Sequence, residues 1–237
     1  MNKPDAILFD LWGTLINSVE FDPRKGHAAV LETCENPKRT TLDEVMDLGQ
    51  RVVSSTVARE EEVALEFTQA SLLRIVADAF DLRPRLSLEE SELVFWRASL
   101  QVSLVDGVTE LLGALEAAGM PMGVVSNSSF ASPSLEAELQ VQGIRRFFGF
   151  VISSADYGVR KPDPIIFEVA LRRLGMQPGQ VWFAGDNITY DIVGARRSGL
   201  FPVAFNPRKP IPDEAGEHAL LSSWSQLLPL IAAAPAG

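Results

Sequence analysis

The chain has 237 residues, of which 46% are hydrophobic and 22% charged, with a formal net charge of −10. This balance is typical of a folded globular protein and excludes disordered and fibrous classes. An acidic surface repels phosphate backbones and anionic lipid, so nucleic acid and membranes are poor candidates for partners. The first residues carry no secretory signal pattern, and no apolar run is long enough to span a bilayer, so we expect a cytoplasmic protein.

The first predicted element is a strand at Ala6–Phe9, after which the pattern changes to helices. Residues 16–100 contain only two of the 17 glycines, which favours helices because glycine weakens helix interiors. Apolar residues recur at helical spacing from Leu42 to Val57 and again from Val63 to Phe80, while shorter helices are expected at 23–34 and 88–99. The single cysteine, Cys34, has no partner for a disulfide and is expected to be a buried, inert thiol.

After residue 100, strand-length apolar runs alternate with helical segments. The predicted strands are Met122–Val125, Phe150–Ile152, Val181–Ala184 and Pro202–Phe205, and the predicted helices are 107–118, 131–142, 164–174 and 189–198. Such alternation implies right-handed crossovers and a parallel sheet. The sequence therefore predicts an α/β domain made of residues 1–15 and 101–237, interrupted by a helical insert over 16–100.

Polar residues with a chemical function follow the predicted strands. They are Asp10 after the first strand, Ser126 after the second, Lys161 after the third, and Asp186 and Asp191 after the fourth. Alone, each has an ordinary structural explanation as a turn former, a cap or a surface charge. Together they predict a site, because ligands bind at the carboxyl ends of strands in an open parallel sheet.

Three carboxylates that converge on one point repel one another unless positive charge compensates them. A lysine ammonium and a hard cation would do so, and carboxylate oxygens suit Mg²⁺. The Ser126 hydroxyl and nearby backbone amides would then donate hydrogen bonds to an anionic substrate. We therefore expect a magnesium site and a small-molecule substrate that carries negative charge.

These motifs resemble the haloacid dehalogenase-like (HAD) superfamily of hydrolases, and the resemblance covers the whole chain. It rests on the segment Phe9–Leu15, on Ser126-Asn127, on Lys161-Pro162 and on Gly185-Asp186 with Asp191, in that order. It implies a Rossmann-like core, whose first strand lies between the fourth and the second, and a mobile helical cap inserted after the first motif. It also implies a phosphorylated small-molecule substrate. The oligomeric state stays open between a monomer and a homodimer, since helical caps can pair but no heptad pattern indicates it.

The resemblance assigns roles to the residues in these motifs. Asp10 would be the nucleophile and a Mg²⁺ ligand, joined by Asp186 and by the backbone carbonyl of Trp12. Asp191 would either bind the metal or lie just outside its ligands. Ser126 and the amide of Asn127 would hold the phosphoryl oxygens, Lys161 would orient Asp10, and Trp12 would lie against the substrate.

The sequence departs from the phosphatase pattern at Trp12, where most phosphatases of this family have a second aspartate that acts as general acid and base. Such help contributes roughly 10²–10⁴-fold in rate. A substrate with a good leaving group would tolerate the loss, or a cap residue, with Glu20 and His27 nearest in sequence, would replace the aspartate.

Two other functions stay open at this stage. Dehalogenases of this family also carry an aromatic residue at the position of Trp12, but they differ around Asp186 and use an arginine for which Arg24 is only a weak candidate. A binding protein could keep the magnesium site without turnover. The cap residues that could select a substrate are Glu20, Phe21, Arg24, His27 and those near 55–60.

Overall fold

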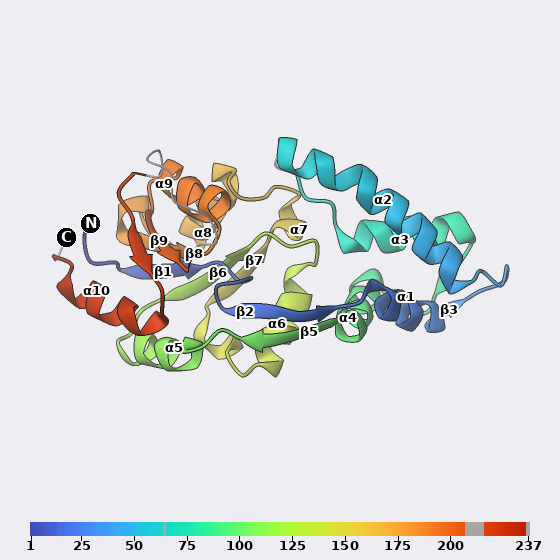
Figure 1. The fold of residues 1–237 in the computed structure, drawn as a ribbon, viewed down its shortest axis with the longest axis horizontal. Coiled ribbons are helices and arrows are strands. Elements are labelled where there is room, and N and C mark those ends of the chain that lie inside the picture. Colours follow the sequence, from blue (N-terminus) through green and yellow to red (C-terminus); the bar gives the residue numbers. More distant parts are fainter. Residues whose placement is uncertain (64, 207–215, 236–237) are drawn as a thin grey trace.

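The computed structural model describes residues 1–63, 65–206 and 216–235, with the backbone alone described at 57–63. Figure 1 shows a sheet flanked by helices at one end of an elongated molecule and a group of helices at the other. Among the described residues, the sheet has six parallel strands in the order β10-β9-β8-β1-β6-β7. Their bounds are β1 Ala6–Phe9, β6 Met122–Ser126, β7 Phe150–Ser153, β8 Val181–Gly185, β9 Phe201–Phe205 and β10 Ala219–Leu221.

The central strand β1 is apolar along its whole length because both of its faces are covered. Ile7 and Phe9 pack into one hydrophobic cluster, and Ala6 and Leu8 pack into another on the opposite face. The first cluster includes residues of α5 (Val108–Ala117), α6 (Ser132–Val141) and α10 (Leu227–Ala233), and the second includes residues of α8 (Pro164–Leu174) and α9 (Gly194–Arg197). The prediction of an α/β fold with a parallel sheet is confirmed, as is the expected place of β1 between β8 and β6.

Short helical turns complete this part of the chain. They are the 3-10 helices Arg145–Phe147, Pro178–Gln180 and Trp224–Gln226, the helix α7 (Ser154–Tyr157) and the π-helix Ile188–Val193, which runs into α9. The predicted helix over 189–198 therefore exists as a π-helical turn followed by an α-helical one. The sixth strand, β10, was not predicted, since three residues of mixed burial give too short a pattern.

The inserted segment contains four helices, which we call the cap: α1 (Pro23–Glu32), α2 (Leu42–Val63), α3 (Gln69–Phe80) and α4 (Leu88–Ser99). The prediction that the third helix begins at Val63 is wrong, because α2 continues to that residue. Thr68 starts α3 instead, and its hydroxyl accepts a hydrogen bond from the Ser71 backbone N–H at 3.0 Å, as an N-cap residue does. The boundary of the cap at residues 16–100 stays a prediction.

Two strand pairings in and beside the cap were not predicted. The antiparallel ribbon of β2 (Ile16–Phe21) and β5 (Leu100–Leu104) connects the sheet to the cap, and β3 (Cys34–Glu35) pairs with β4 (Arg83–Pro84). The ribbon escaped prediction because β2 is exposed after its first residue and shows no apolar face. Cys34 is half-buried, and burial raises the pKa of its thiol, consistent with the expected inert state.

The cap is attached to the rest of the molecule through α4 and α6. The buried Glu92 on α4 accepts hydrogen bonds from the Ala131 backbone N–H at 2.8 Å and from the Ser134 hydroxyl at 3.0 Å. The Trp96 indole, also on α4, donates to Glu138 at 3.0 Å. Ala131 is the N-cap residue of α6, and its side chain cannot accept a hydrogen bond. The Glu92 carboxylate of the cap instead accepts the backbone N–H at the start of this helix.

A second attachment lies between α2 and α3, where residues 65–69 run along the loops beyond β6 and β7. The Glu66 backbone N–H donates to the Gly158 carbonyl at 3.1 Å, and the Gln69 backbone N–H donates to the Ser129 carbonyl at 2.8 Å. The Glu66 carboxylate also accepts from the Ser154 hydroxyl at 2.6 Å. Within the described residues, no helix is long and apolar enough to cross a membrane.

Candidate active site

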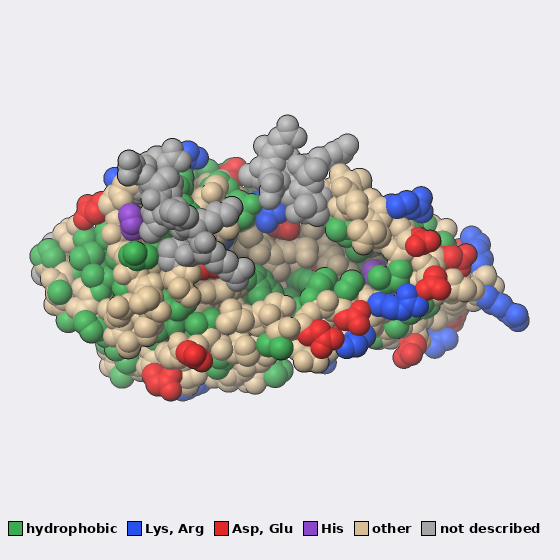
Figure 2. All heavy atoms as spheres, in the orientation of Figure 1, with side chains coloured by type: hydrophobic (Ala, Val, Ile, Leu, Met, Phe, Trp, Pro, Cys, Tyr) green, Lys and Arg blue, Asp and Glu red, His purple; other side chains and the backbone are tan. Residues whose placement is uncertain are grey.

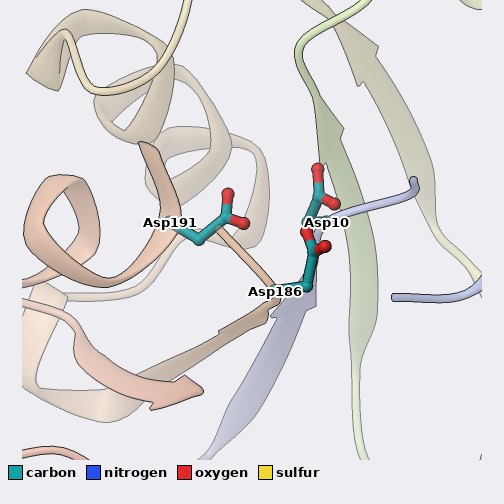
Figure 3. A group of neighbouring side chains, drawn as sticks. All are labelled: Asp10, Asp186 and Asp191. Atoms are coloured by element: carbon teal, nitrogen blue, oxygen red, sulfur yellow. The ribbon is translucent and has the colours of Figure 1, made fainter. Parts of the chain in front are cut away.

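Three aspartates meet at the carboxyl ends of β1 and β8. Asp10 follows β1, Asp186 follows β8, and Asp191 lies in the π-helical turn that comes next. Figure 3 shows their side chains facing one another, and one ligand oxygen of each lies within 4.8 Å of those of the other two. The structure thus brings together the three carboxylates that the sequence predicted at one sheet edge.

Lys161 bridges two of these carboxylates. Its Nζ lies 2.7 Å from Asp10 Oδ1 and 2.7 Å from Asp191 Oδ1, and the residue is 1% exposed. Burial alone would lower the pKa of Lys161, but the charges of Asp10 and Asp191 outweigh burial and raise the pKa. The ammonium is therefore charged and fixed between the two aspartates.

The site still carries excess negative charge. One ammonium compensates one of three carboxylates, and burial raises the pKa of Asp191, with the charge of Asp10 adding to this effect. Both oxygens of Asp191 are already hydrogen-bonded, Oδ1 to Lys161 and Oδ2 to the Asn187 backbone N–H at 2.9 Å. The cluster of Asp10, Asp186 and Asp191 could therefore hold a cation that offsets this charge.

Two glycines let the carboxylates approach the backbone. Gly13 has φ +74°, and a Cβ at this residue would lie 2.5 Å from Asp186 Oδ2. A Cβ at Gly185 would collide with the carboxyl carbon of Asp191. Both positions therefore exclude any side chain, which explains why glycine stands at each of them.

Asn127 holds the backbone of Lys161. Its side-chain Nδ2 donates to the Lys161 carbonyl at 2.9 Å, and its Oδ1 accepts from the Lys161 backbone N–H at 2.8 Å. This pair of bonds joins the end of β6 to the segment that carries the lysine. The expected role of the Asn127 backbone amide in substrate binding stays a prediction.

Two hydroxyl groups lie among these residues. Ser126 ends β6 and is completely buried, with a long hydroxyl contact of 3.4 Å to the Asn127 carbonyl. The Thr14 hydroxyl, which the sequence analysis did not single out, donates to Asp10 Oδ2 at 3.3 Å. Its signal in the sequence was its place in the Phe9–Leu15 motif, four residues after the aspartate.

Trp12 packs against the cap. Its ring lies 5.7 Å from that of Trp96 on α4, measured between ring centroids, and the Trp96 ring in turn meets Phe130 edge-on at 4.8 Å. The indole of Trp12 is half-buried between the first motif and the cap. Position 12, where the sequence analysis expected a departure from the phosphatase pattern, therefore makes an aromatic contact with the cap.

The other cap candidates make their contacts within the cap. Glu20 pairs with Lys25 at 2.7 Å and Arg24 with Asp43 at 2.7 Å, all on the surface, and Phe21 is exposed. His27 is buried and lines a cavity of about 210 Å³ between the cap helices. Of residues 55–60, the side chains of 57–60 lie outside the described residues.

Comparison with known proteins identifies the family. A family model described as a haloacid dehalogenase-like hydrolase matches residues 4–199. The chain belongs to this family. It is therefore a hydrolase that acts on small molecules, and its acidic cluster is able to bind a metal ion.

Relatives of this HAD-like hydrolase include both dehalogenases and phosphatases. The chain is 25% identical over 222 residues to (S)-2-haloacid dehalogenase 2 of Pseudomonas sp. (strain CBS-3), covering 92% of this chain and 90% of that one. It is 31% identical over 169 residues to a phosphoglycolate phosphatase of Escherichia coli O157:H7, covering 70% and 56%. A solved 2-haloacid dehalogenase of Pseudomonas syringae pv. Tomato DC3000 shares the fold, with a TM-score of 0.65, 23% identity and coverage of 98% and 99%.

Proposed function

We propose that this HAD-like hydrolase is a magnesium-dependent phosphatase that acts through an aspartyl-phosphate on Asp10. The observation that carries the proposal is the group of three carboxylates, Asp10, Asp186 and Asp191, with a single buried lysine among them. Three negative charges and one positive charge leave an excess of about two, which fits a divalent cation. Carboxylate oxygens are the ligands that Mg²⁺ prefers.

The residues that would hold Mg²⁺ are Asp10, Asp186 and the backbone carbonyl of Trp12, with Asp191 fixing Lys161 beside them. When bound, Mg²⁺ would screen the negative phosphoryl group from the attacking carboxylate and stabilise charge in the transition state. The chain's own residues supply the nucleophile, a fixed ammonium and hydrogen-bond donors.

The reaction divides into two displacements at phosphorus. An Asp10 carboxylate oxygen forms a bond to phosphorus while the bond to the leaving oxygen breaks, and the leaving oxygen takes its proton from solvent. Water then attacks the phosphorus of the aspartyl-phosphate, which releases inorganic phosphate and restores Asp10. Lys161 holds Asp10 in position at 2.7 Å, and Ser126 and the Asn127 amide would donate to the phosphoryl oxygens.

Trp12 sets the expected preference for substrates. Its indole has no proton to exchange near neutral pH, so the leaving oxygen receives no help from this position. Within the cap, Glu20 is paired with Lys25 and His27 is enclosed by the helices, so their observed contacts offer no replacement. We therefore expect acyl and aryl phosphates, whose leaving groups are stable as anions, to be hydrolysed faster than alkyl phosphates.

A second candidate function is dehalogenation, in which Asp10 would attack carbon and displace halide. The aromatic residue at position 12 and the 25% identity to a haloacid dehalogenase over 92% of the chain favour it. The retained Asp186 and Asp191 count against it, and so does the surface pairing of Arg24 with Asp43, which leaves that arginine away from a substrate carboxylate.

The test is an assay of the purified protein against an alkyl, an acyl and an aryl phosphate and against 2-chloropropionate, each with Mg²⁺ and with EDTA. Asp10→Asn serves as the control in every sample. Phosphate release that needs Mg²⁺, fails in Asp10→Asn and is fastest with good leaving groups supports the proposal. Halide release that survives EDTA would replace it with dehalogenation. Magnesium binding without any turnover would indicate a binding protein.

A further inference from the structure

A cavity of about 280 Å³ lies where the cap meets the loops beyond the sheet. Its walls come from α2, from the start of α3 with the segment before it, and from the loops that follow β6 and precede α8. The described residues that line it include Glu66, Gln69, Asn127, Ser128, Ser129 and Arg160. Figure 2 shows the hollow between the two parts of the molecule.

The cavity adjoins the reaction centre through Asn127 and Arg160. Asn127 binds the backbone of Lys161 with two hydrogen bonds, Arg160 is the residue before that lysine, and Lys161 Nζ contacts Asp10 at 2.7 Å. Two residues in the cavity wall, Asn127 and Arg160, are thus the chain neighbours of Ser126 and Lys161. The volume is just below the range of pockets for drug-sized ligands, about 300–1,000 Å³, which suits a leaving group of a few heavy atoms.

Gln69 presents an unused hydrogen-bond donor in this cavity. The residue is 7% exposed, and its Nε2 has no hydrogen-bond partner within the described part of the chain. Its backbone N–H is bonded to the Ser129 carbonyl at 2.8 Å, so the residue is fixed at the junction of the cap and the loops. A buried amide is normally hydrogen-bonded, and a donor without an acceptor here indicates that a bound molecule supplies one.

The charges around the cavity balance each other. The charged residues among those described in its walls are Glu66 and Arg160, and Arg160 Nε lies 3.6 Å from Glu66 Oε2. Glu66 also accepts the Ser154 hydroxyl at 2.6 Å. Among the described wall residues the cation Arg160 is thus paired with Glu66, so a ligand carboxylate would meet the negative charge of Glu66 as well, whereas an uncharged oxygen would find the Gln69 amide.

We propose that this cavity binds the leaving group, and that Gln69 Nε2 donates a hydrogen bond to a hydroxyl or carbonyl oxygen of it. The substrate class is then a phosphate whose small leaving group carries a further uncharged hydroxyl or carbonyl oxygen and no further carboxylate. This inference rests on the proposed phosphatase function.

The kinetic test compares the wild type with Gln69→Met, which keeps the length of the side chain, removes the donor and adds no charge, and with Gln69→Leu. Gln50→Leu, on the exposed face of α2, is the matched control. The substrates are phenyl phosphate, which has no oxygen beyond the ester, glycerol 3-phosphate, glyceraldehyde 3-phosphate and 2-phosphoglycolate. We expect the two Gln69 variants to lower kcat/KM roughly 5- to 10-fold on the glycerol and glyceraldehyde esters, mainly through KM, and to leave phenyl phosphate unchanged.

Two kinetic results would overturn the proposal. An equal loss on phenyl phosphate would show that Gln69 acts only in folding, and a wild-type preference for 2-phosphoglycolate over the uncharged esters would refute the substrate class. Hydrolysis of phenyl phosphate by the wild type, lost in Asp10→Asn, reports separately on the proposed function.

A binding test keeps the inference testable if no substrate turns over. Calorimetry with glycerol 3-phosphate in the presence of Mg²⁺ compares Asp10→Asn with the double variant Asp10→Asn/Gln69→Met. We expect the Kd to rise roughly 5- to 10-fold in the double variant. An unchanged Kd, or no binding of glycerol 3-phosphate to either protein, would refute the subsite whatever the outcome of the kinetic assay.

Discussion

Below pH 6.5, protonation of His27 is expected to destabilise the protein. The side chain is 4% exposed, its ring meets Phe95 edge-on at 5.0 Å, and a Cβ added at Gly49 would lie 3.3 Å from its Nε2. Burial lowers the pKa of His27 from 6.5 to about 4, because the charged imidazolium loses its hydration in this setting. The unfolded chain therefore binds more protons than the native one between these two pH values.

The size of the destabilisation follows from the shift in the pKa of His27. A pKa lowered by about 2.5 from the ordinary 6.5 corresponds to about 3.4 kcal/mol once the pH is well below 4. At pH 5 about 2 kcal/mol of this is already lost. The native state is thus penalised as the pH falls through 6.5 and on to about 4, and it is unaffected above pH 6.5.

The assay is urea unfolding of the wild type and of His27→Leu at pH 7.5 and pH 5, in EDTA and followed by tryptophan fluorescence. Between these pH values the wild type should lose about 2 kcal/mol more than the variant, since all other titrating groups are common to both. Because the chain has only two histidines, an NMR titration can also follow His27 directly. The same pH dependence in both proteins, or a titration midpoint near 6.5, would refute the argument.

Three further predictions concern the candidate active site. Gly13→Ala should weaken Mg²⁺ binding at least tenfold in calorimetry, because its Cβ would lie 2.5 Å from Asp186 Oδ2. The control is Gly119→Ala, which has φ +70° and open space around it and should bind Mg²⁺ as the wild type does. Lys161→Met should lower the free energy of unfolding of the metal-free protein by about 3–5 kcal/mol, because it leaves two buried carboxylates without their cation; an unchanged urea midpoint would contradict this. Trp12→Asp should raise turnover of alkyl relative to acyl phosphates by roughly 10²–10⁴-fold, and a constant ratio would show that position 12 does not limit proton transfer.

The sheet and the gathering of the acidic residues were predictable from the sequence. Strands such as Ala6–Phe9 and Val181–Gly185 are buried on both faces and show as unbroken apolar runs. Since all of them are parallel, the residues that follow them meet at one edge, so the sequence alone predicts that Asp10, Asp186 and Lys161 lie together.

Features that depend on contacts across long sequence separations were not predictable. The environment of His27, the pairing of β2 with β5 and the cavity around Gln69 depend on how the cap helices settle on the loops. Glu92 appeared in the sequence as one acidic residue among several on α4, and its bond to Ala131, 39 residues away, has no local signal. Helical periodicity also missed the start of α3, because apolar residues continue through the connecting segment that ends at Thr68.

The bond between Glu92 and the start of α6 has a consequence for exchanging caps between related proteins. A chimera that replaced residues 16–100 with a foreign insert would remove the acceptor of the Ala131 N–H and of the Ser134 hydroxyl, and with it the Trp96 donor to Glu138. The recipient scaffold would then fray at a helix that lies outside the exchanged segment. A transplant would keep these hydrogen bonds at the start of α6 if it preserved an acid at the position of Glu92.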